Sequence, residues 1–339
     1  MTALAAARDS IAAALADHAS GAELVGLKPL VGGACQDNVR VDLRIDGEDT
    51  RLVVRSDSPG GLPGTIDRAR EFNVMQAAVA AGVKTPGVRW LTQGLLRDGA
   101  WAYFMDWSDG VAIGRKVLRS PELAEARQGL PDELGTQLAA IHAITPESEI
   151  GQTITAFPAP SDPIEETLRS LRHHIDQQAD PSPATELIYR WLAENPPSCR
   201  DVVLTHGDYR VGNFMVSPRG LENVLDWEFA HWNSPYSDLA WISVRDWRFN
   251  RIHQPIGGFA PRAPFYAAYE AASGRTVDLA DVHWWEIKGN LSWAMGSVSQ
   301  AARYAAGETD LELIAIGRRA AEMEYEALRL IETGVSGLG

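Results

Sequence analysis

A cluster of polar residues at fixed spacing limits the folds open to this chain more than any other feature. Residues 202–216 read VVLTHGDYRVGNFMV, so that His206, Asp208 and Asn213 lie between two apolar runs. Asp226 follows on the next apolar run, in VLDWE. Short runs of this kind predict β-strands. The pattern H-x-D-x-x-x-x-N with a later Asp therefore indicates strands that hold a rigid polar loop.

Length and composition are those of a folded protein with two packed lobes. The chain has 339 residues, more than a single hydrophobic core usually supports. Hydrophobic residues make up 45% and charged residues 22%, which argues against a largely disordered or fibrous chain. The formal net charge of −14 disfavours partners such as nucleic acid or an anionic membrane. No signal peptide or membrane-spanning stretch is recognisable, so we expect a cytoplasmic location.

Residues 1–107 predict a lobe built on an antiparallel sheet. After an N-terminal amphipathic helix, three short β-branched runs follow, and Asp46-Gly47 between two of them is a hairpin signal. Residues 65–82 then repeat apolar side chains at helical spacing. Two further strands are expected in GVRWLTQG and AWAYFMDW. The first lobe is therefore predicted to hold five antiparallel strands and one internal helix.

Residues 108–339 predict a mostly helical lobe. Helical periodicity marks residues 162–178 and 183–194, a long stretch from about residue 235, and the C-terminal segment. The exception is the polar segment, where DVVL, NFMV and NVLDW predict short strands around a polar hairpin. The predicted fold class is α+β with two lobes.

The residue types in the polar segment are those that phosphoryl transfer needs. That reaction requires a carboxylate to orient and deprotonate a hydroxyl, and hard oxygen ligands to hold Mg²⁺ against a triphosphate. Asp208 would be the base, Asn213 would offer the metal an amide oxygen, and Asp226 would bridge the metal to the phosphates. Glu228, two residues further along the predicted strand, would point to the same face as Asp226 and touch a second metal, directly or through water.

Two segments of the chain resemble the aminoglycoside phosphotransferase family of small-molecule phosphotransferases: LTHGDYRVGNFMV and, after it, VLDWEFAHWNSPYSDLAWI. Within that family, the chain is most similar to the branch associated with acyl-CoA dehydrogenases. The resemblance implies a bilobal protein-kinase-like fold and transfer of the γ-phosphate of ATP or GTP to a hydroxyl. It implies Asp208 as the catalytic base and Asn213 and Asp226 as magnesium ligands. It also implies that Asp238 ties the start of a helix to the catalytic loop, and that His206 is structural.

The same resemblance assigns the nucleotide to the first lobe. The segment VGGACQDN, which contains Gly32 and Gly33, would fold over the phosphates. Because it is not a G-x-G-x-x-G motif, an ordinary turn is the alternative. YFMDW would form the hinge between the lobes. Backbone groups around Met105 and Trp107 would then read the edge of the adenine.

Two arginines take positions where protein kinases have lysines. Arg55 stands where a kinase has its phosphate-pairing Lys, and Glu71 on the following helix would be its ion-pair partner. A solvated helix residue is the alternative for Glu71. Arg210, two residues beyond Asp208, would stabilise charge on the transferring phosphate, or it forms a salt bridge to a nearby carboxylate.

Three classes of function are compatible with these residues. The first is an ATP- and Mg²⁺-dependent kinase acting on the hydroxyl of a small molecule. The second is a nucleotide-binding pseudokinase that serves as a regulatory or scaffold module, motivated by Arg55 and the unusual glycine loop. The third is a metal-dependent hydrolase using Asp226 and Glu228, which leaves Asn213 unexplained.

The sequence says little about the acceptor or the oligomeric state. Eleven tryptophans are a high count, and most lie in the second lobe. They form either an aromatic acceptor pocket or an ordinary packed core. An aminoglycoside would need a cleft rich in Asp and Glu, whereas a hydroxyacyl or aromatic hydroxyl compound suits a Trp-rich lobe.

Overall fold

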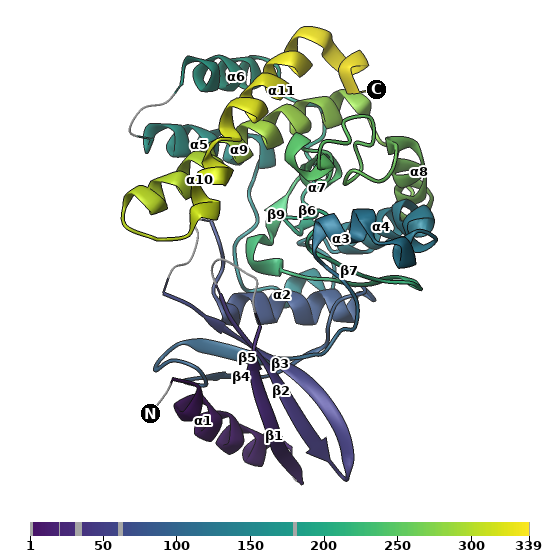
Figure 1. Cartoon of the computed structure of the whole chain (residues 1–339). Helices are drawn as coiled ribbons and strands as arrows, with labels where there is room; N and C mark the ends of the chain where they lie inside the picture. The colour runs from purple at the N-terminus through teal and green to yellow at the C-terminus, as the bar shows by residue number, and fades with distance from the viewer. Residues whose placement is uncertain (1–2, 20, 31–35, 60–63, 179–181, 339) are drawn as a thin grey trace.

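The structure is a computed structural model with two lobes, one built on a sheet and one mostly helical (Figure 1). It describes residues 3–19, 21–30, 36–59, 64–178 and 182–338. The first lobe contains five strands in the order β1-β2-β3-β5-β4, and all neighbours are antiparallel. These strands are β1 (Ala22–Pro29), β2 (Gln36–Ile45), β3 (Glu48–Asp57), β4 (Val88–Gln93) and β5 (Trp101–Asp106). The predicted sheet is confirmed.

Different helices cover the two faces of this sheet (Figure 1). α1 (Ala3–His18) packs on the outer face, where it shares a buried cluster with alternate residues of β3 such as Val54. α2 (Arg68–Ala80) lies on the face towards the second lobe. Because side chains alternate along a strand, Arg55 and Tyr103 point to the α2 side. The sheet therefore presents these two polar side chains to the space between the lobes.

The second lobe is organised around the long helix α9 (Leu279–Ala305), which packs against several of the other helices. The helices of this lobe are α3 (Gly114–Arg119), α4 (Ala126–His142), α5 (Pro163–Asp176), α6 (Pro183–Glu194), α7 (Tyr236–Trp241), α8 (Arg262–Ser273), α9, α10 (Leu311–Gly317) and α11 (Ala320–Thr333). The helices predicted over residues 162–178 and 183–194 are confirmed as α5 and α6. In the described part of the chain, no helix is long and apolar enough to cross a membrane. The lobe boundary predicted after residue 107 stays a prediction.

The predicted polar hairpin is wrong in its strand pairing. β6 (Val203–Thr205) pairs with β9 (His231–Asn233), a strand that the sequence analysis missed. β7 (Phe214–Ser217) pairs with β8 (Gly220–Val224). The polar loop therefore connects two separate small sheets. The loop does not form a hairpin, because the chain turns inward at Tyr209. The side chain of Tyr209 is fully buried in the hydrophobic core.

The long helical stretch predicted from about residue 235 is also wrong. α7 ends at Trp241, and only a short 3₁₀ helix, Arg245–Arg248, follows before α8. Phe249 and Asn250 have φ angles of 48° and 66°, in the left-handed region. A right-handed helix cannot pass through that region, so the segment forms a compact loop instead.

One glycine is required by the packing of α4 against α8. A Cβ atom on Gly135 would lie 2.4 Å from the backbone oxygen of Phe265 in α8. Gly129, in the same helix, has only the end of the Glu133 side chain within 4 Å, at 3.9 Å. The two positions therefore separate the cost of close helix packing from the ordinary helix propensity of glycine.

We expect Gly135→Ala to lower the free energy of unfolding by about 2 kcal/mol, because the added methyl group forces α4 and α8 apart. Gly129→Ala should leave it unchanged or raise it by up to about 1 kcal/mol, since alanine favours helix. Urea denaturation of both variants measures the difference. Equal effects at the two positions would contradict the packing argument.

Candidate active site

An ion pair between β3 and α2 lies at the centre of the space between the lobes. Arg55 Nε donates to Glu71 Oε2 at 2.9 Å and Nη2 donates to Glu71 Oε1 at 2.8 Å. Both side chains are buried, and Nη2 also pairs with Asp226 of the second lobe. Tyr103 Oη donates to Glu71 Oε2 at 2.7 Å. Burial alone would lower the pKa of Arg55, but Glu71 and Asp226 hold it well above its ordinary value.

A second buried arginine, Arg68, completes this charge cluster, and the sequence analysis missed it. Arg68 is 3% exposed, and its Nη1 lies 2.5 Å from Glu71 Oε2. Its Nη2 lies 3.5 Å from Glu228 Oε2, and its Nε lies 3.4 Å from Asp57 Oδ1. One feature of the sequence could have indicated a special role for Arg68. It directly follows Asp67, the N-cap of α2, at a position where the helix dipole disfavours a cation.

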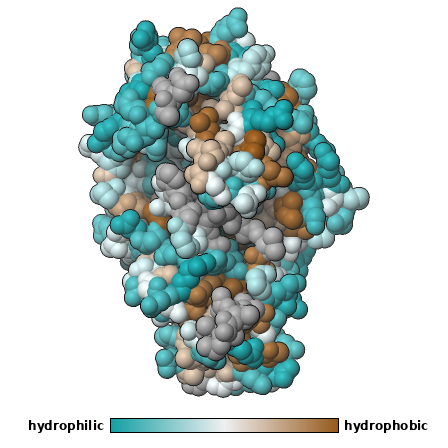
Figure 2. Space-filling view, turned by 60° about the vertical axis from the view of Figure 1, so that its left-hand side comes forward, coloured by the Kyte–Doolittle hydropathy of each residue, from teal (hydrophilic) through white to brown (hydrophobic). Residues whose placement is uncertain are grey.

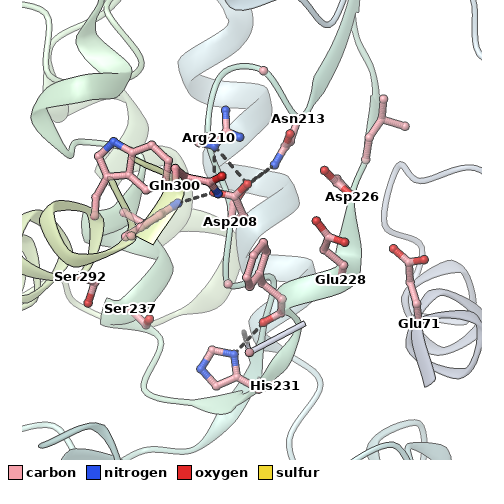
Figure 3. Close-up of a pocket in the computed structure, with 18 of the residues that line it drawn as sticks. Glu71, Asp208, Arg210, Asn213, Asp226, Glu228, His231, Ser237, Ser292 and Gln300 are labelled. Carbon is pink, nitrogen blue, oxygen red and sulfur yellow. Dashed lines mark hydrogen bonds and ion pairs between the residues drawn. The ribbon is translucent and has the colours of Figure 1, made fainter. Parts of the chain in front are cut away.

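Asp226 and Glu228 both line the cleft, but not as neighbours on a strand. Asp226 has a φ of 70° and Glu228 belongs to a 3₁₀ turn, Trp227–Phe229, so the strand predicted through both residues is wrong. The positive φ ends β8 and turns the chain. Figure 3 shows the two carboxylates on one side of Asp208, facing Glu71 across the site. Burial, helped by the negative charge of Asp226, raises the pKa of Glu228 to about 7.

The carboxylate of Asp208 is held by three side chains. Arg210 Nε lies 2.8 Å from Oδ1 and 3.0 Å from Oδ2, Asn213 Nδ2 donates to Oδ2 at 2.6 Å, and Trp241 Nε1 donates to Oδ1 at 2.8 Å. The salt-bridge partner of Arg210 is therefore Asp208 itself (Figure 3). Because the amide nitrogen of Asn213 is used in this way, its carbonyl oxygen is the atom left for another ligand.

The backbone of the same loop is anchored by Asp238 of α7. Asp238 Oδ2 accepts a hydrogen bond from His206 N at 2.7 Å, and Oδ1 accepts one from Gly207 N at 3.0 Å. Burial opposes the ionisation of Asp238, but hydrogen bonds from His142 and from His206 N keep its pKa below its ordinary value. Gly207 has a φ of 78°, and a Cβ there would lie 2.2 Å from the backbone oxygen of Phe229. Only glycine fits this position.

Trp241 connects the loop to an aromatic cluster. It lies three residues after Asp238, so one turn of α7 contacts both the backbone and the carboxylate of the loop. Its ring centroid is 5.7 Å from that of Trp247, and Trp247 is 4.9 Å from Trp293. The guanidinium carbon of Arg210 lies 4.4 Å from the Trp247 ring centroid. The tryptophan count predicted an aromatic cluster or pocket, but no local signal in the sequence indicates that Trp241 binds Asp208.

The remaining predicted nucleotide contacts lie at the edge of the same cleft. Met105 and Trp107 line it, at the end of β5 and just beyond, together with Arg55 and Glu71. The predicted phosphate loop with Gly32 and Gly33 lies outside the described residues. The cleft has a volume of about 1750 Å³ and extends from β3 and β5 to α9 and α10. It is large enough for a nucleotide and a second ligand together.

The cleft also contains oxygen donors for a metal. Among the described residues, no three His, Cys, Asp or Glu side chains form a metal-binding group. The predicted ligands are instead two carboxylates, Asp226 and Glu228, and the amide oxygen of Asn213. All three line the cleft, and oxygen donors of this kind suit Mg²⁺.

The fold is that of the protein-kinase-like phosphotransferases. The chain belongs to the phosphotransferase enzyme family, whose model matches residues 26–285. The family is one of phosphotransferases, and the structural neighbours share the fold of this chain.

Individual proteins are similar to this chain over different parts of their length. A structure from Ralstonia eutropha, assigned as an aminoglycoside phosphotransferase, has a TM-score of 0.75 and 20% identity, and the match covers 96% of this chain and 98% of that one. A choline/ethanolamine kinase family protein from Mesorhizobium loti has a TM-score of 0.59 and 19% identity, with 98% and 99% covered. Mouse acyl-CoA dehydrogenase family member 10 is 27% identical over 197 residues, which are 57% of this chain and 18% of that protein. The chain thus matches less than a fifth of the length of this curated relative.

We expect Arg68→Met to lower the free energy of unfolding by about 3 kcal/mol, because Glu71 and Glu228 lose a buried counter-charge. Arg70→Met is the matched control, since Arg70 is exposed in the same helix, and it should change stability by less than about 0.5 kcal/mol. Urea denaturation measures both. An effect of Arg68→Met no larger than that of the control would show that Arg68 does not stabilise the cluster.

Proposed function

We propose that this chain transfers the γ-phosphate of ATP or GTP to a hydroxyl of a small molecule, with Mg²⁺ as cofactor and Asp208 as catalytic base. One observation carries the proposal. A carboxylate held by three donors lies in the same cleft as two further carboxylates and a free amide oxygen. A general base must be oriented, and a triphosphate needs a metal beside it, so this cleft meets both requirements.

Asp208 would accept the proton of the attacking hydroxyl. Arg210, Asn213 and Trp241 fix the direction of its carboxylate before the acceptor arrives, which lowers the entropic cost of a productive geometry. Arg210, placed beside the base, would then stabilise negative charge on the transferring phosphate. Asp238 would act only on the loop backbone, as a positioning residue.

Asn213, Asp226 and Glu228 would hold Mg²⁺, which neutralises the charge of the phosphates when it is bound. Arg55 uses Nε and Nη2 for Glu71 and Asp226, so Nη1 would remain for a phosphate oxygen. Glu71 would keep that guanidinium in place. Met105 and Trp107, at the far end of the cleft, would border the adenine, and Gly32 and Gly33 would cover the phosphates. The cytoplasmic location remains a prediction from the sequence.

One contact favours the second candidate, a nucleotide-binding pseudokinase. Arg55 pairs directly with Asp226, and this pairing competes with a metal for the same carboxylate. The oriented Asp208 argues for the kinase, since a scaffold has no need of a base held by three donors. A protein that binds Mg·ATP but transfers phosphate to no hydroxyl would be the pseudokinase.

Asp208→Asn should lower kcat for transfer to a hydroxyl by about 10²-fold to 10⁴-fold, because the base is lost while the backbone of the loop keeps its hydrogen bonds to Asp238. Its affinity for Mg·ATP should not change. The assay follows loss of the γ-phosphate of ATP and GTP with pooled hydroxyl compounds, and Asp98→Asn, on an exposed turn, is the control. Full activity of Asp208→Asn would exclude Asp208 as the base.

Asp226→Asn should weaken binding of Mg·ATP by at least about tenfold, because a charged metal ligand is lost. Binding of ATP without Mg²⁺ should stay equal or become tighter, since Arg55 is released from a carboxylate. Isothermal titration with and without Mg²⁺ separates the two effects. Equal loss under both conditions would mean that Asp226 does not act through the metal.

A further inference from the structure

The cleft continues past Asp208 along one face of α9. Lys288, Ser292, Met295 and Ser299 line it, at the spacing of three to four residues that places side chains on one side of a helix. Figure 3 shows Ser292 across Asp208 from Glu71 and the predicted metal ligands. This end of the cleft therefore lies where an acceptor would approach the base.

Lys288 is a cation that lines this end of the cleft. Among the described residues, its ammonium group takes part in no hydrogen bond or ion pair. The ammonium lies 5.6 Å from the ring centroid of Trp285. Burial lowers the pKa of Lys288 to about 8, partly opposed by the charge of Asp238. Asp238 is already bound to the amides of the catalytic loop.

The described neighbours of Lys288 on other elements include histidines of the cleft wall and exposed carboxylates. His174 of α5 and His231 of β9 line the same end, and both have lowered pKa values, caused first by burial and further by the charge of Lys288. The carboxylates here are exposed at the rim of the cleft. They are Glu166, which pairs with Arg169, and Asp310 and Glu312 at the start of α10. An ammonium in such a place is stabilised by an anionic ligand.

Apolar side chains make up much of the wall around Lys288, beside polar groups such as Ser292 and Ser299. Trp241 and Trp293 have their indole N–H groups bound to Asp208 and Asp246, so the rest of each ring is apolar surface. The other apolar side chains that line this end are Trp232, Met295, Val298, Leu313 and Ile316. A ligand that fits these walls has an apolar body.

We propose that the acceptor carries an anionic group on an apolar body, and that Lys288 binds this group while the hydroxyl points at Asp208. The inference rests on the proposed function, because it names the acceptor class for that site. It also separates this chain from kinases whose acceptors are cations, since a cation inside this end of the cleft would be repelled by Lys288, and the carboxylates here are exposed to solvent.

Three probes with one body and one hydroxyl test the charge preference: 4-(hydroxymethyl)benzoate, 1,4-benzenedimethanol and 4-(aminomethyl)benzyl alcohol. Isothermal titration of the full chain should show the carboxylate binding at least about tenfold tighter than the diol, with the amine weakest. Lys288→Met should remove the advantage of the carboxylate, and Lys288→Arg should keep most of it. Lys116→Met, an exposed lysine of α3, is the control and should change nothing.

The pH provides a second readout. Affinity for the carboxylate should fall between pH 7 and pH 9, as Lys288 loses its proton, while affinity for the diol stays constant.

The proposal is overturned if the amine binds as tightly as the carboxylate, if Lys288→Met keeps the preference, or if none of the three binds. Carboxylate binding through Lys288 without any phosphate transfer would support this inference and count against the proposed function. Phosphate transfer without a preference for the carboxylate would support the proposed function and overturn this inference.

Discussion

The ion pair between Arg55 and Glu71 is the interaction on which the rest of the site depends. It joins β3 to α2 inside the first lobe, and through Asp226 it reaches the second. Arg68 is needed as well, because one guanidinium cannot balance three carboxylates in a place with little water. The two arginines face four carboxylates, since Arg68 also pairs with Asp57, so the cluster keeps a net negative charge that suits the proposed metal site.

A second set of contacts, made by α7, holds the loop that contains Asp208. α7 is only six residues long, but Asp238 and Trp241 lie on one turn of it and bind the loop at its backbone and at its carboxylate. Trp241 also packs on Trp247, which supports Arg210. Rigid support of this kind is what a base requires, because a small error in its direction costs much of the rate. The tryptophans around the loop are therefore both core and site.

The cleft combines two chemical environments. Its inner part, between the lobes, is dominated by charged side chains in ion pairs, while its outer part along α9 has many apolar side chains around Lys288. Phosphate and metal suit the first environment, and an apolar acceptor suits the second. The fold alone does not make this division, since the structural neighbours carry acceptor names as different as choline and aminoglycoside.

Elements with local signals could be predicted from the amino-acid sequence. Strand alternation, helical spacing and the Asp-Gly turn predicted the five-stranded sheet and α5 and α6, and the motif spacing predicted which polar residues share a loop. Other features depend on how the chain packs: the pairing of β6 with β9, the turn at Asp226, the contacts of Arg68 and the bond from Trp241 to Asp208. Each of these joins residues distant in sequence or depends on a backbone angle, and neither leaves a periodic signal in the chain. Burial, which converts Lys288 and Glu228 from surface charges into site residues, is likewise a property of the packed structure.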